Sequence, residues 1–109
     1  MSDSPDPFAP SRLGPVTLRN RIIRAATFEG MTGDQCVSDR LIAFHRAAAR
    51  GGVGMTTMAF CAVSPDGAGT PNELVLTKSA LPGLRKLAEA VHAEGAAVSA
   101  QIGHAGAVA

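Results

Sequence analysis

The sequence contains no tryptophan and no tyrosine, and its only aromatic residues besides histidine are four phenylalanines among 109 residues. The side chains best suited to stacking on nucleobases are therefore scarce. The charge pattern does not indicate nucleic-acid binding either, because ten basic and nine acidic residues are interspersed and leave a net charge of +1. This composition argues against polymeric nucleic acid as a partner.

Cysteine and long hydrophobic runs are also scarce. Cys36 and Cys61 lie far apart without the spacing of paired metal ligands, so we expect no disulfide framework and no metal site. No apolar run approaches the roughly 20 residues needed to cross a bilayer. Residues 1–7 are acidic and rich in proline, unlike a signal peptide. These features predict a cytoplasmic protein with reduced thiols and no membrane partner.

A hydrophobic content of 46% is sufficient for one globular domain over residues 1–109, with residues 1–7 as a flexible tail. Residues 8–18 predict two short strands joined at Gly14 and Pro15. Buried strands are expected over residues 22–26, 53–59 and 96–102. A helix capped by Ser38 or Asp39 and ending near Arg50 separates the first two. A second helix precedes the third strand, with Leu84, Leu87, Ala88 and Val91 on its apolar face and Gly95 at its end. This alternation is typical of parallel βαβ units.

Each predicted strand ends in residues that could form a site. The small side chains of Ala25, Ala26 and Thr27 could face a planar ligand, or could simply pack at a strand end. The segment 58–62 is mostly apolar, which is more typical of a core. The Gln101 amide can donate and accept hydrogen bonds, which suits the edge of a heterocycle and equally suits a solvated strand end.

The three histidines allow different interpretations. His104 lies two residues beyond the third strand between Gly103 and Gly106, where it could be an acid, an anion ligand or a structural residue. His45 and His92 lie within the predicted helices, so we interpret them as surface or packing residues without a functional role.

Several separated motifs then agree in order and spacing with one family. They comprise Pro10, Leu13 and Gly14, residues 18–22, the Ala-Ala-Thr segment, and residues 51–54, 64–67 and 101–106. Together they resemble the amino-terminal part of the Old Yellow Enzyme family. These proteins are FMN-dependent NADH:flavin oxidoreductases and ene-reductases, and they include the 2,4-dienoyl-CoA reductase-like branch. The family fold is a TIM (β/α)8 barrel of roughly 250 residues or more. The resemblance implies an α/β chain with the first three strands and two helices of that barrel.

The resemblance also implies site residues. Ala25, Ala26 and Thr27 would lie against FMN, and the Gln101 amide would bond to the flavin pyrimidine edge. Phe60 would lie beside the flavin, where many relatives have a small residue.

Two further residues match the family motifs as possible site support. Phe28 occupies the position of a Thr or Cys that tunes the flavin in relatives, although its ring cannot donate that hydrogen bond. His104 matches the histidine of the strand-three motif, whereas Ala107 replaces a common arginine.

The implied reaction is hydride transfer from NADH or NADPH, through FMN, to an enone or enoyl-type substrate. The family's catalytic residues would lie beyond residue 109, so the sequence identifies none. The alternative interpretation is a non-catalytic remnant or assembly fragment in which the same residues only pack. Unpaired strand edges would then favour self-association.

Overall fold

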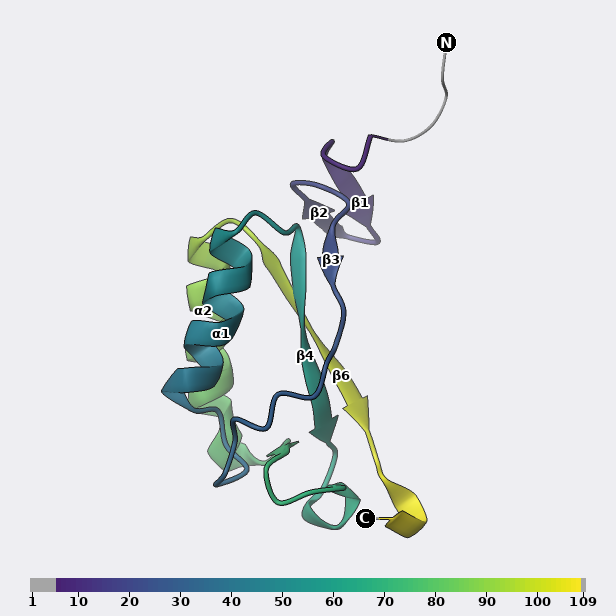
Figure 1. Cartoon of the computed structure of the whole chain (residues 1–109), viewed down its shortest axis with the longest axis vertical. Coiled ribbons are helices and arrows are strands. Elements are labelled where there is room, and N and C mark those ends of the chain that lie inside the picture. Colours follow the sequence, from purple (N-terminus) through teal and green to yellow (C-terminus); the bar gives the residue numbers. More distant parts are fainter. Residues whose placement is uncertain (1–5, 109) are drawn as a thin grey trace.

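The longest strand, β4 (Met55–Ala62), is the centre of a four-stranded parallel sheet in the computed structural model, which describes residues 6–108 (Figure 1). β6 (Ala97–Gly103) pairs along one side of β4. On the other side, β3 (Ile23–Arg24) pairs at the start of β4 and β5 (Leu74–Val75) pairs at its end. The order of β3, β4 and β6 confirms the predicted parallel βαβ arrangement.

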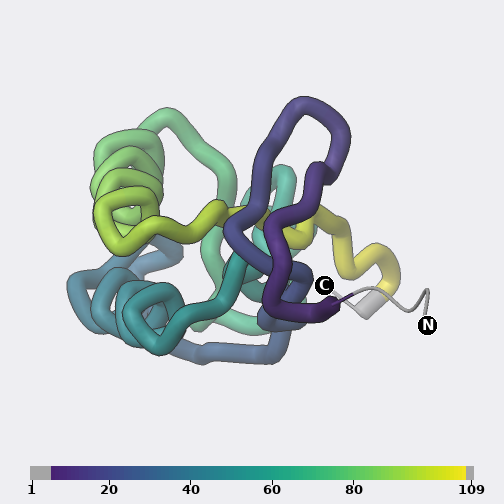
Figure 2. The backbone as a smooth tube through the Cα atoms, turned by 90° about the horizontal axis from the view of Figure 1, so that it is seen from above, coloured from purple at the N-terminus to yellow at the C-terminus, as the bar shows by residue number. Residues whose placement is uncertain are grey.

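Two amphipathic helices, α1 (Asp39–Arg50) and α2 (Leu81–Ala93), lie side by side on one face of the sheet (Figure 2). The Ser38 hydroxyl caps α1 by accepting the N–H of Leu41 at 3.0 Å, as predicted. Gly95 follows α2 with φ of +87°, a conformation that favours glycine. The core lies between the helices and the sheet, and consists of Leu41, Ala49, Met58, Cys61, Leu74, Ala80, Leu87, Val91 and Ala96.

An antiparallel hairpin of β1 (Ser11–Leu13) and β2 (Val16–Leu18) precedes the sheet, as predicted, and turns at Gly14 with φ of +59°. It lies at the amino-terminal end of the sheet (Figure 1). Arg19, which follows the hairpin, ties this end together. Its guanidinium donates to the carbonyls of Ala49 at 2.5 Å, Val53 at 2.9 Å and Glu94 at 2.7 Å.

Three short 3-10 helices complete the structure, over Pro65–Gly67, Lys78–Ala80 and Gly106–Val108. Most of the predicted tail, residues 1–5, lies outside the described residues. Among residues 6–108, no helix is long and apolar enough to cross a membrane.

The predicted burial of the first strand is wrong. β3 covers two residues instead of five, and Ile22 and Ile23 are 37% and 46% exposed. The reason is that β3 is an edge strand, which pairs with β4 alone among residues 6–108. The radius of gyration is 15.1 Å, above the roughly 13 Å of a compact domain of about 100 residues, which agrees with a sheet that is covered on one face.

The other strand predictions need smaller corrections. β4 starts and ends later than the predicted 53–59, and β6 is shifted by one residue from 96–102. β5 was not predicted, because two residues carry no periodicity and their pairing with β4 is determined by tertiary structure.

Candidate functional site

The sheet has an open face, which we define as the face opposite the two helices. Thr56 of β4 bonds to His45 of α1, so Thr56 points to the helices and its neighbour Thr57 points to the open face. The Thr57 hydroxyl lies 2.8 Å from the Ser99 hydroxyl of β6. Since side chains alternate along a strand, Gln101 and Gly103 share the open face with Ser99.

A β-bulge interrupts the pairing of β4 with β6 at this point. Met58 pairs with Ala100 and Cys61 pairs with Ile102, so three steps along β4 match two along β6. Ala59 and Phe60 therefore lie together opposite Gln101. Bulges are common beside binding sites because they redirect side chains.

The structure brings Phe60 and Gln101 together on adjacent strands at the carboxyl end of the sheet. Gln101 is exposed, whereas Phe60 is half-buried. A Cβ atom built on Gly103 would collide with the Phe60 ring, so this ring lies over Gly103 on the open face. The carboxyl ends of parallel strands are where α/β folds bind ligands.

The predicted platform residues follow β3 as an irregular segment. Ala25 and Thr27 are exposed and Ala26 is half-buried. The segment has no strand conformation, because the pairing of β3 with β4 ends at Arg24. Small, accessible side chains leave room for a flat ligand to approach.

Phe28 is 63% exposed and lines a small cavity of about 20 Å³ together with Phe60. Glu29, Met58 and Leu74 also line this cavity. The two phenylalanines that depart from the family pattern are thus close to the same pocket.

His104 connects two loops at the same end of the sheet. Its Nδ1 accepts the N–H of Gly106 at 2.8 Å, so the ring proton of a neutral His104 is on Nε2. This Nε2 lies 3.8 Å from the Asp66 carboxylate. The pKa of Asp66 is below its usual value, mainly because the Ser64 hydroxyl donates to it and to a smaller extent because of His104.

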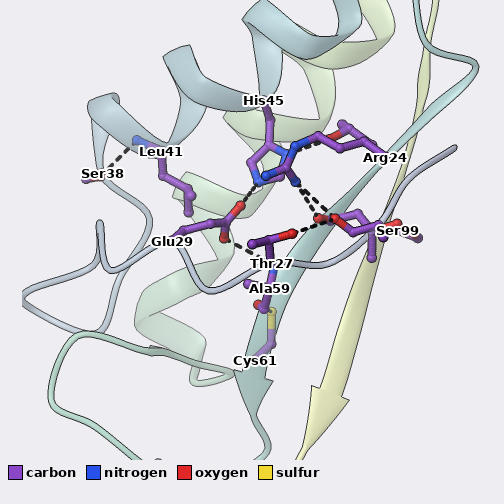
Figure 3. A network of polar contacts seen from close by, with 12 residues as sticks. Arg24, Thr27, Glu29, Ser38, Leu41, His45, Ala59, Cys61 and Ser99 are labelled. Carbon is purple, nitrogen blue, oxygen red and sulfur yellow. Dashed lines mark hydrogen bonds and ion pairs between the residues drawn. The ribbon is translucent and has the colours of Figure 1, made fainter.

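The interpretation of His45 as a residue without a role missed a buried polar network. His45 is fully buried, and its Nδ1 lies 2.7 Å from the Thr56 hydroxyl. Its Nε2 pairs with the Glu29 carboxylate, which reaches in from the segment after β3 (Figure 3). The helical spacing contained a signal, because His45 is four residues from both Leu41 and Ala49 and therefore lies on the buried face.

Cys61 belongs to this region but is not a reactive thiol. The side chain is fully buried, and burial, followed by the charge of Glu29, raises its pKa to about 11. The thiol therefore stays protonated at neutral pH and donates to the Ala59 carbonyl at 3.3 Å. Cys36 and Cys61 are both free thiols.

The chain resembles characterised oxidoreductases in sequence. It is 60% identical over 111 residues to the 4,4'-dithiodibutanoate disulfide reductase of Rhodococcus erythropolis, an alignment that covers 100% of this chain and 28% of the relative. A metal reductase of Desulforamulus reducens is 40% identical over 91% of this chain and 15% of its own length. The chain therefore spans less than a third of these relatives.

Solved structures agree with this relationship. Morphinone reductase in complex with tetrahydroNAD matches 97% of this chain and 29% of its own with a TM-score of 0.87 and 27% identity. A 2-naphthoyl-CoA reductase matches 94% of this chain and 16% of its own with a TM-score of 0.88 and 34% identity. The sheet and its two helices thus form the first part of a TIM barrel, as the resemblance implied. The model of one family matches residues 6–109, and the chain therefore belongs to the NADH:flavin oxidoreductase / NADH oxidase family.

Proposed function

We propose that this chain supplies one wall of an FMN site in an NAD(P)H-dependent oxidoreductase. One observation carries the proposal: the bulge in β4 sets Phe60 opposite the exposed Gln101 at the carboxyl end of a parallel sheet. An aromatic ring beside an amide that can donate and accept suits a planar heterocycle with mixed donors and acceptors. The residues present therefore fit a flavin.

The chain's own residues would bind and orient the ring. Ala25, Ala26 and Thr27 would contact its plane through small side chains and backbone groups. Gln101 would hydrogen-bond to its pyrimidine edge, and Phe60 would pack beside it. Phe28 and His104 would support the site from the adjoining loops.

When bound, FMN supplies hydride transfer between NADH or NADPH and a small acceptor. We infer an enone or enoyl-type acceptor from the family resemblance. Disulfides are a second class of acceptor to test, because a relative that is 60% identical to this chain is a disulfide reductase. Catalytic residues for either acceptor are expected outside residues 1–109.

The test is FMN titration of the intact protein that contains this chain, by absorbance and fluorescence quenching, followed by NADH and NADPH oxidation. Replacing Gln101 by Leu removes the amide, and we expect FMN binding to weaken about tenfold, as for a lost hydrogen bond to a buried ligand group. Gln35→Asn is a matched control, because Asn tolerates the positive φ of this loop residue. Absence of FMN binding at millimolar concentration would exclude the proposal.

The alternative function is a non-catalytic fragment, and its distinguishing property is self-association. Phe28 and Ile102 are 63% and 62% exposed, and among the described residues 6–108 no strand pairs with the outer edges of β3 and β6. We expect residues 1–109 expressed alone to self-associate, which light scattering measures. A monodisperse chain that binds FMN would contradict the alternative.

Free Cys36 and Cys61 support a cytoplasmic location, where thiols remain reduced.

A further inference from the structure

One backbone donor in β4 is satisfied by a side chain instead of a strand. β3 pairs with β4 as far as Thr56, and β5 pairs from Cys61 onward, so in the part of the chain that the structure describes no strand pairs with the intervening residues on that side. Ala59 lies in this gap and is also one of the two bulge residues. Its N–H donates to Oε1 of Glu29 at 3.1 Å (Figure 3).

The Glu29 carboxylate is itself held in place. Its Oε2 pairs with Nε2 of His45, and the two side chains are 8% and 0% exposed. Within residues 6–108, neither atom has a hydrogen-bond partner apart from this pairing. Thr56 fixes the other nitrogen of the His45 ring. The carboxylate position is therefore set by α1 and β4 together.

The carbonyl of Ala59 is also satisfied by a side chain, since the Cys61 thiol donates to it. Both polar backbone groups of this bulge residue thus bond to neighbouring side chains. A bulge whose backbone groups lacked such partners would leave polar groups unpaired at a buried position, because Ala59 is only 9% exposed.

We infer that Glu29, held by His45, is a positioning residue that maintains the bulge at Ala59 and Phe60 and thereby sets the edge that faces Gln101. This inference rests on the proposed function only where it concerns FMN. Glu29 acts through the backbone of Ala59, so the length of its side chain matters more than its charge. The network is separate from the residues proposed to touch the cofactor.

Two conservative substitutions in the intact protein distinguish the effect of the length of the Glu29 side chain from the effect of its charge. Glu29→Gln keeps the oxygen at the same distance and can donate to His45, so Ala59 stays bonded. Glu29→Asp keeps the charge but is one methylene too short. For Glu29→Asp we expect amide hydrogen exchange at Ala59 about tenfold faster and FMN binding about tenfold weaker, as for one lost hydrogen bond. Glu29→Gln should stay within about threefold of wild type in both measurements.

Glu73→Asp is the matched control. Glu73 lines the same cavity and accepts a backbone N–H, but from Gly69 in a loop outside the bulge. Ala59 exchange should not change in this variant. The inference is overturned if Glu29→Asp leaves Ala59 exchange unchanged, or if Glu29→Gln, which keeps the shape of the side chain, exposes that amide.

Different results would overturn the proposed FMN site and the proposed role of Glu29. Faster exchange at Ala59 with unchanged FMN affinity would overturn the link between the bulge and the cofactor. A wild-type protein that does not bind FMN would overturn the proposed function, and exchange at Ala59 in the variants would still decide the role of Glu29.

Discussion

The two ends of the sheet use polar groups in opposite ways. At the amino-terminal end, Arg19 donates to three main-chain carbonyls, and Asn20 donates to Gly52 at 2.6 Å. An ion pair at 2.9 Å between Arg50 and Glu94 adds to this end, and the hydrogen bond from Arg50 is the main reason that the pKa of Glu94 is below its usual value.

Toward the carboxyl end, a polar network is buried between α1 and the middle of β4, and the surface at the end of the sheet is accessible. Glu29 and His45 are enclosed, whereas Phe28 and Gln101 are exposed. The comparison indicates that the two ends of the sheet have different roles. The amino-terminal end holds the elements together, and the carboxyl end leaves side chains accessible, as does the end that generally binds ligands in barrels built of parallel strands.

The largest predicted effect concerns the amino-terminal end. Arg19→Met removes the side-chain donor from the carbonyls of Val53 and Glu94 at partly buried positions. The Ala49 carbonyl loses one of two donors, since it also accepts the Gly52 N–H at 3.1 Å. We expect the free energy of unfolding of the intact protein to fall by about 3 kcal/mol, measured by urea denaturation. FMN affinity of the folded protein should not change.

Arg85→Met is the control for this prediction, because Arg85 is exposed on α2, and its effect should stay within about 0.5 kcal/mol. Weaker FMN binding in Arg19→Met without loss of stability would contradict the purely structural role of the amino-terminal end.

The second prediction concerns the carboxyl end. Gly103→Ala places a Cβ atom against the Phe60 ring, which must move. We expect FMN binding to weaken about tenfold with a smaller loss of stability, as for an overpacked site. Gly33→Ala is the control, since the nearest atom to its added Cβ is 3.9 Å away.

A double-mutant cycle tests the cause of this effect. In a Phe60→Ala background the added methyl group has room, so Gly103→Ala should cost little there. Equal effects of Gly103→Ala in both backgrounds would show that the Phe60 contact is not responsible.

Among the substitutions, the smallest predicted effect is on the pKa of the Cys61 thiol. Burial is the larger cause of its raised pKa and the charge of Glu29 the smaller, so Glu29→Gln should lower the pKa from about 11 while leaving it above 9.0. Thiolate absorbance in a Cys36→Ser background measures this, with Cys61→Ala as the blank. An unchanged pKa would mean that Glu29 does not act on the thiol.

The raised pKa of Cys61 also predicts a pH dependence of stability. The folded state retains the thiol proton more strongly than the unfolded state does. The resulting stabilisation is complete below pH 9.0 and is lost, by about 3 kcal/mol, as the pH rises to about 11.

The helices could be predicted from the sequence because their signals are local. Apolar spacing, the Ser38 cap and Gly95 all act within a few residues of the helix ends. The positions of β4 and β6 followed from apolar runs bounded by glycine, with errors of up to three residues. Membership in the family was also predictable from several spaced motifs.

The bulge and the Glu29 network could not be predicted, since they depend on contacts across the fold. Glu29 and Ala59 are 30 residues apart, and no local pattern indicates that one bonds to the other. The exposure of Ile22 and Ile23 was missed for a related reason. A β-branched pair predicts a strand, but burial depends on which strands lie beside it.

The contacts of Arg19 have a consequence for the order of folding. Its partners lie 30, 34 and 75 residues further along the chain, so the contacts require successively longer loops to close. Those to Ala49 and Val53 can form once α1 has joined β4, whereas the one to Glu94 must await α2. During synthesis, which begins at the amino terminus, an early arginine would therefore complete its bonding only after both helices have docked.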